Sequence, residues 1–218
     1  MTSQSLNSGW TFFHREQWLD AQVPGCVHTD LLQHNLIPDP YWGRNEEKLQ
    51  HLEEEDWTYR LDFDLDASLL EQTNVELVAS GLDTVATLTL NGSKIASVDN
   101  MFIEHRFPVK NLLREGSNRL EIYFTSPMKY IRSRPLVDDL VESNEPVGGR
   151  TLIRKEQCSF GWDWGPRFAS SGIWRPIRLE GWSANRIESV QVTQDHQAEA
   201  VQLTFAPYLS QEGTETIR

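Results

Sequence analysis

The sequence predicts an all-β protein built as an antiparallel β-sandwich. Short segments in which apolar and polar side chains alternate recur along the chain, turn signals separate them at intervals of about ten residues, and helical periodicity is almost absent. The clearest alternation has these apolar members: Trp57, Tyr59, Leu61, Phe63 and Leu65. Such a strand has one face in a core and the other in water.

Ahead of this strand, the pattern indicates a first strand and its exit within residues 1–20, and a break at residues 23–25. Residues 29–34 are expected to form a short helix that carries Leu31 and Leu32 and ends at Asn35, because Pro38 and Pro40 prevent its continuation. The aromatic and polar segment 39–46 is expected to be a loop and a second candidate place for contact with a ligand.

After this strand, further alternating segments predict more strands. They are residues 75–79, 85–90, 94–98, 102–107 and 120–124. Asn91-Gly92 predicts a two-residue type I′ hairpin turn. Residues 128–150 are expected to be a long connecting loop with one helical turn at 128–132. A closing strand follows at residues 172–179, where Pro176 requires an edge position or a bulge.

A domain boundary is expected at residues 182–185. A new alternating series begins there, with strands at residues 187–192 and 201–205 that have too few partners for an independent sandwich. The predicted organisation is a sandwich domain at residues 1–184 and the first part of a second β-sandwich domain at residues 185–218.

Composition and charge restrict the expected partners. With 20 Lys and Arg against 32 Asp and Glu, the net charge of −12 excludes nucleic acid as the expected partner and favours a neutral ligand. Cys26 and Cys158 are the two cysteines, and they are expected to be buried thiols in a reducing compartment. We find no signal peptide and no apolar run that could span a membrane, so a cytoplasmic location is expected.

The stretch with the strongest indication of a binding site is Trp162-Asp163-Trp164, which is flanked by two glycines. Indole faces stack on sugar rings, and a carboxylate between them accepts hydrogen bonds from hydroxyl groups. Alternatively, the indoles plug the end of the sandwich and Asp163 caps a turn. Asp163 could also be a catalytic acid or base, but a glycosidase needs a second carboxylate at about 5 Å for retention or roughly 6.5–9.5 Å for inversion. The sequence offers no candidate partner.

Other candidates favour structural roles. The acidic run at residues 53–56 is expected to be a solvated turn. The six histidines show no metal-ligand spacing, and no nucleophile elbow, phosphate loop or dinucleotide motif occurs, so no metal or cofactor is expected. The cations that flank the aromatic motif, Arg154, Lys155 and Arg167, are expected to form ion pairs with acidic side chains.

Together, several blocks of the sequence resemble the N-terminal domain of the β-mannosidases of glycoside hydrolase family 2. In chain order these blocks are residues 23–32, 37–40, 55–60, 81–84, 90–92, 99–102, 154–167 and 172–174. The resemblance covers about residues 8–182, and its most specific part is the Gly-Trp-Asp-Trp-Gly-Pro block at residues 161–166.

This resemblance implies a jelly-roll, galactose-binding-like sandwich, followed by an immunoglobulin-like domain and a barrel that carries two catalytic glutamates. It implies that Trp162, Asp163 and Trp164 bind a terminal β-mannose, with Asp163 accepting hydrogen bonds and the indoles forming the wall of the subsite. The expected function is that of a non-catalytic domain of an exo-acting, retaining β-mannosidase.

The same resemblance sets the expected partners, which are a β-mannoside or manno-oligosaccharide and the remaining domains of the parent enzyme. No catalytic residue is expected among these 218 residues, so the chain alone is expected to be inactive. The alternatives are a free-standing carbohydrate-binding module and an interdomain brace without affinity for sugar.

Overall fold

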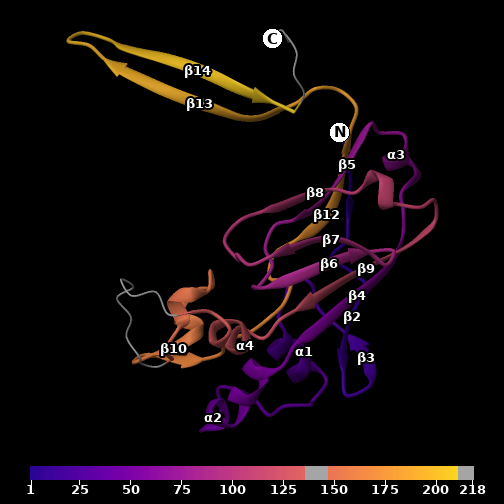
Figure 1. The fold of residues 1–218 in the computed structure, drawn as a ribbon, viewed down its shortest axis with the longest axis vertical. Helices are drawn as coiled ribbons and strands as arrows, with labels where there is room; N and C mark the ends of the chain where they lie inside the picture. Colours follow the sequence, from indigo (N-terminus) through magenta and orange to yellow (C-terminus); the bar gives the residue numbers. More distant parts are fainter. Residues whose placement is uncertain (136–146, 211–218) are drawn as a thin grey trace.

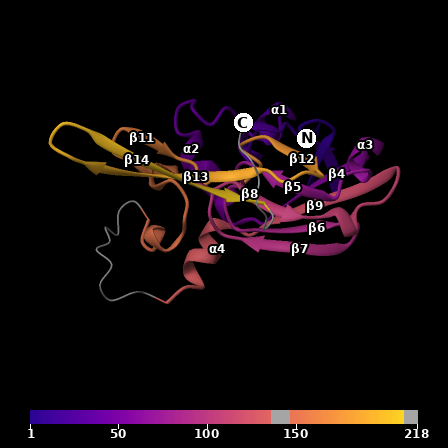
Figure 2. The ribbon, with the colours of Figure 1, turned by 90° about the horizontal axis from the view of Figure 1, so that it is seen from above.

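The computed structural model describes residues 1–135 and 147–210 and contains two antiparallel sheets that form the layers of a sandwich (Figure 1, Figure 2). One sheet has the strand order β3 (Gln17–Asp20), β2 (Trp10–His14), β4 (Trp57–Asp64), β9 (Ser117–Phe124), β6 (Ala86–Leu90) and β7 (Ser93–Val98). The other has the order β1 (Thr2–Ser5), β12 (Ile177–Trp182), β5 (Asn74–Ala79) and β8 (His105–Pro108). The predicted all-β sandwich is confirmed.

The main core lies between the sheets, where the alternating strands bury their apolar faces. Tyr59 of β4 is fully buried, and Leu77 of β5 and Leu179 of β12 are each 1% exposed in the same cluster. Burying one such side chain contributes about 1.5–3 kcal/mol. Residues Trp57 and Phe124 face each other across β4 and β9, which fixes one end of that register.

The turn between β6 and β7 confirms the type I′ prediction. Asn91 and Gly92 both have positive φ values, 53° and 81°, as this turn requires. The Asn91 side chain also donates hydrogen bonds of 2.8 Å to the Leu112 carbonyl and the Asn118 side chain. The turn is therefore tied to the loop that precedes β9.

Short helices connect the strands. The α-helices are α1 (Val27–Gln33), α2 (Asn45–Leu49), α3 (Ala67–Leu70) and α4 (Pro127–Arg132), and the 3₁₀ helices are η1 (Gln50–Glu54), η2 (Lys110–Leu112), η3 (Arg150–Leu152) and η4 (Gln157–Ser159). The predicted helices near residues 29–34 and 128–132 are confirmed, and Ser126 caps α4 through the Lys129 amide. The loop expected at residues 39–46 ends earlier, because α2 begins at Asn45. Part of the predicted long connecting loop, residues 136–146, lies outside the described residues.

Two strands begin several residues later than predicted. The strand expected at residues 172–179 begins only at Ile177, so Pro176 precedes it and needs neither a bulge nor an edge. The Pro176 carbonyl accepts a hydrogen bond of 3.0 Å from the Ser80 amide, which ties this segment to the end of β5. The strand expected at residues 102–107 begins at His105, because Phe102 is 55% exposed in a turn before it.

The prediction of buried cysteines is wrong. Cys26 is half-buried and Cys158 is exposed. Cys26 precedes the first turn of α1, and Cys158 lies in η4 on the surface, so neither thiol lies on the inward face of a strand.

The last described elements, β13 (Ile187–His196) and β14 (Val201–Leu209), form a two-stranded antiparallel sheet that projects away from the sandwich (Figure 1). The predicted strands at residues 187–192 and 201–205 are therefore confirmed and are longer than expected. Within the part of the chain that the structure describes, no helix is long and apolar enough to cross a bilayer.

Candidate functional site

The aromatic motif lies at the tip of a short hairpin. We call residues 160–167 the Trp hairpin; it consists of β10 (Phe160–Trp162) and β11 (Gly165–Arg167). Phe160 pairs with Arg167 and Trp162 pairs with Gly165, so Asp163 and the following indole form a two-residue loop. The hairpin lies beside α4, at the end of the sandwich opposite α3 (Figure 1).

The base of the Trp hairpin is buried and its tip is exposed. Phe160 is fully buried in a second apolar cluster, together with Met128, Ile131, Val147, Ile153 and Ala169. By contrast, Trp162 is 44% exposed and Trp164 is 79% exposed. These exposures disagree with the alternative in which the indoles plug the sandwich.

The two indoles of the tip contact each other. Their ring centroids are 5.3 Å apart at an interplanar angle of 50°, and Asp163 between them is exposed. The guanidinium of Arg150 lies 5.5 Å from the ring centroid of Trp162, within cation–π range. Asp163 makes no hydrogen bond or ion pair with the described residues, so its oxygens are available to a ligand. No local pattern in the sequence points to Arg150, which lies twelve residues before Trp162.

Glu53 holds the base of the hairpin, and the expectation of a solvated acidic run is wrong at this residue. Glu53 is 1% exposed, and its carboxylate accepts bonds of 2.9 Å from Nε and 2.6 Å from Nη2 of Arg167. It also accepts the Ala169 amide at 3.3 Å. The Arg167 amide donates to Glu46 of α2 at 2.7 Å. The run of like charges predicted exposure to solvent, but the Glu53 carboxylate binds Arg167 of β11.

A buried ion pair anchors the segment on either side of the hairpin. Lys155 is 2% exposed; its ammonium donates to Asp83 and, at 2.9 Å, to the Ser170 carbonyl. His28 contacts the Ser170 hydroxyl at 3.3 Å, and its pKa is lowered to about 4, first by burial and then by the charge of Lys155. The expected ion pairing is confirmed for Lys155 and for Arg167 at the base of the hairpin. Arg154 is exposed and has no acidic partner among the described residues.

The loop that was expected to contact a ligand contributes two exposed aromatic side chains. Tyr41 and Trp42 are each 76% exposed, and Tyr41 lies edge-on to Phe168 with ring centroids 5.4 Å apart. A cavity of about 190 Å³ beside Tyr41 is lined mainly by apolar atoms, including Leu32 and Pro40. Because Phe168 directly follows β11, this surface adjoins the Trp hairpin in the chain.

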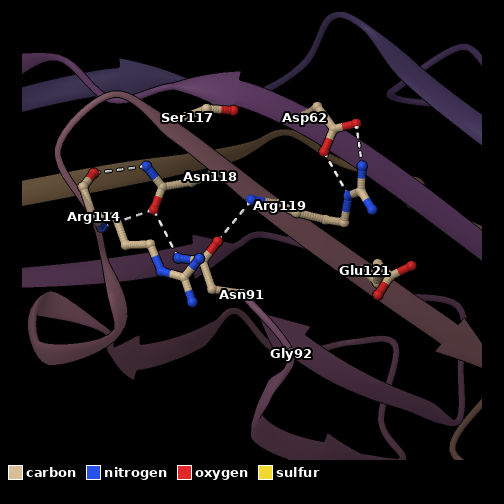
Figure 3. A pocket seen from close by; sticks show the side chains of 8 residues that line it. All are labelled: Asp62, Asn91, Gly92, Arg114, Ser117, Asn118, Arg119 and Glu121. Carbon is tan, nitrogen blue, oxygen red and sulfur yellow. Dashed lines mark hydrogen bonds and ion pairs between the residues drawn. The ribbon is translucent and has the colours of Figure 1, made fainter.

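A polar pocket of about 430 Å³ lies at the other end of the larger sheet, near the Asn91-Gly92 turn (Figure 3). Several of its polar groups already have partners: Arg119 pairs with Asp62 at 2.7 Å, and Asn118 bonds to Asn91 and to the backbone of Arg114. The pocket is therefore a weaker candidate than the Trp hairpin. Within the described residues, no cluster of three or more metal-ligating side chains occurs.

Comparison with known proteins agrees with the fold. The family described as glycosyl hydrolase 2 galactose-binding domain-like matches residues 10–175. A β-mannosidase of Rattus norvegicus is 35% identical over 196 residues, which is 85% of this chain and 22% of the relative. β-Mannosidase B of Thermothelomyces thermophilus is 41% identical over 73% of this chain and 19% of its own length.

Solved structures give the same result. The β-D-mannosidase of Dictyoglomus thermophilum superposes with a TM-score of 0.86 at 41% identity and covers 94% of this chain and 26% of its own. A β-glucuronidase from an uncultured Clostridium shares the fold, with a TM-score of 0.61 at 20% identity. The chain thus spans about a fifth to a quarter of these relatives, and their catalytic domain is not in it. The chain belongs to glycoside hydrolase family 2, as the galactose-binding-like N-terminal domain found in its β-mannosidases.

Proposed function

We propose that this chain contributes the Trp hairpin to the sugar subsite of an exo-acting, retaining β-mannosidase. The observation that carries the proposal is the exposed tip, where Asp163, which has no partner among the described residues, lies in sequence between two tryptophans whose ring centroids are 5.3 Å apart. Such a tip is costly in solvent, because it leaves large apolar area in water. A bound sugar would cover it.

Each residue of the tip has a distinct role in this proposal. The faces of Trp162 and Trp164 contact the C–H faces of the terminal mannose, and Asp163 accepts hydrogen bonds from its hydroxyl groups. One charge-assisted hydrogen bond with one stacked ring contributes about 2–4 kcal/mol. The cation of Arg150, 5.5 Å from the Trp162 ring, keeps that indole in place. The nucleophile and the acid/base that cleave the glycosidic bond lie outside these residues, so this chain alone hydrolyses nothing.

We also propose that residues 185–218 begin a second β-sandwich domain, as the sequence predicts. In the β13–β14 hairpin, Val192 faces Phe205 and Gln194 faces Leu203, whereas Thr193 faces Thr204 on the opposite side. One face of the hairpin is therefore mostly apolar. Val192 is 48% exposed and Phe205 is 61% exposed, which fits a face that further strands would cover.

Calorimetric titration of this chain with mannose and mannobiose tests the proposal. A shared subsite predicts no binding tighter than about millimolar to the isolated chain, because the other half of the site is missing. Tighter binding that is lost in Asp163→Ala would favour the free-standing module instead. Asp62→Ala is the matched control, because this exposed aspartate pairs with Arg119 away from the Trp hairpin.

A further inference from the structure

Glu53 and Arg167 form the main polar contact between the Trp hairpin and the rest of the chain. We propose that Glu53 is a positioning residue, which through Arg167 sets the direction in which the hairpin presents Trp162 and Asp163. This inference rests on the proposed function only where it concerns sugar; the effect on the hairpin itself does not depend on it.

The contact is bidentate and buried. The side chain of Glu53 is 1% exposed and that of Arg167 is 20% exposed. Oε2 of Glu53 accepts bonds of 2.6 Å from Nη2 and 2.9 Å from Nε, and Oε1 accepts a bond of 3.1 Å from Nε. The second carboxylate oxygen accepts the Ala169 amide at 3.3 Å. A carboxylate with both oxygens engaged by a planar guanidinium fixes orientation as well as distance. Neither side chain can rotate without breaking several bonds at once.

The tip of the hairpin depends on this base. Strands β10 and β11 have three residues each, and two residue pairs join them, Phe160 with Arg167 and Trp162 with Gly165. A two-stranded hairpin of this length is at best marginally stable without tertiary contacts. The exposed indoles supply few such contacts, so the position of the tip follows from the residues at the base.

Glu53 itself is held from another direction. Its carbonyl accepts the Ser126 hydroxyl at 2.5 Å, directly before α4. Its neighbour Glu54 pairs with Arg132 of α4 through two bonds of 2.6 Å. Helix η1 is therefore held against α4, and the buried carboxylate of Glu53 in η1 gives the Trp hairpin a fixed binding partner.

The experiment compares Glu53→Gln with Glu54→Gln by hydrogen exchange of the 218-residue chain under native conditions. Both variants replace one oxygen of a carboxylate in the same 3₁₀ helix, but Glu54 pairs with α4 and not with the hairpin. The probe is the Phe168 amide, which donates to the Ser159 carbonyl at 2.9 Å across the base of the hairpin. Amides of β4 and β9 report on the sandwich.

We expect Glu53→Gln to accelerate exchange at Phe168 about tenfold or more, while β4 and β9 change by no more than about twofold. Glu54→Gln leaves Phe168 unchanged. An equal acceleration at all sites would show that Glu53 merely stabilises the fold, and no acceleration at Phe168 would show that it does not hold the hairpin; either result overturns the inference. If Glu53→Gln fails to fold, Arg167→Lys, which keeps the charge without the planar fork, is judged by the same criteria.

The kinetic readout uses a β-mannosidase that carries this chain as its N-terminal domain. Glu53→Gln should lower kcat/KM for an aryl β-mannoside about tenfold without lowering the melting temperature by more than Glu54→Gln does. Asp163→Ala is measured beside it. If Asp163→Ala keeps full activity, the proposed function fails while the exchange result still stands; if only Asp163→Ala loses activity, the positioning role of Glu53 is overturned.

Discussion

Replacing Lys155 by methionine tests whether the buried ion pair anchors the segment that carries the Trp hairpin. The Lys155 side chain is fully buried and that of Asp83 is 7% exposed. Methionine fills most of the volume of the aliphatic stem but removes the ammonium, so the carboxylate and the Ser170 carbonyl lose a donor. Removing one partner of a buried pair costs about 3–5 kcal/mol.

The matched control is Arg119→Met. Arg119 pairs with Asp62 at 2.7 Å, but their side chains are 50% and 54% exposed. An exposed pair contributes about 0–1 kcal/mol. The expected loss in free energy of unfolding is therefore several times larger for Lys155→Met than for Arg119→Met.

Urea unfolding followed by far-ultraviolet circular dichroism measures both variants, with the slope against urea as the check for two-state behaviour. If Lys155→Met does not fold, the double variant Lys155→Met/Asp83→Asn should restore part of the stability, because it leaves no buried charge unpaired. A loss of less than about 1 kcal/mol for Lys155→Met would refute the reasoning, as would equal losses for Lys155→Met and Arg119→Met.

Two further predictions concern the same region. The pKa of His28 is lowered to about 4 in the folded protein and is near 6.5 in the unfolded chain. Its contribution to the free energy of unfolding is therefore complete above pH 6.5, and about 3 kcal/mol is lost as the pH falls to about 4. Thermal melts of His28→Gln should show a flatter pH dependence than those of the unchanged protein. A Cβ at Gly172 would lie 2.7 Å from Cα of Cys26. Gly172→Ala should therefore lower the free energy of unfolding by about 1–3 kcal/mol, whereas Gly165→Ala, whose Cβ meets no atom within 4 Å, should not, as urea titration would show.

The strands of the sandwich were predictable because their signal is local. The alternation at Trp57, Tyr59 and Leu61 identifies the buried face of β4 from five residues, and the dipeptide Asn91-Gly92 identifies the turn type from two residues. Packing between the sheets then follows from those faces, since each must be buried.

The surroundings of the site depend on contacts that the sequence does not show. Glu53 lies 114 residues from Arg167, so its acidic neighbours suggested water although its partner is buried. Strands β10 and β11 have three residues each, too few for an alternating pattern to indicate this hairpin from the sequence. Composition pointed to the tip residues as candidates for sugar binding, but only the fold shows what holds them.

The role of Asp163 is tested most directly by kcat/KM for an aryl β-mannoside, measured in a β-mannosidase that carries this chain as its N-terminal domain. A hydrogen bond to a charged group contributes about 1.5–3 kcal/mol, which predicts that Asp163→Ala lowers kcat/KM about 10-fold to 150-fold. The melting temperature should not change, because this side chain is exposed at the tip and has no partner among the described residues. Unchanged kcat/KM in Asp163→Ala would contradict the assignment of the Trp hairpin to the sugar subsite.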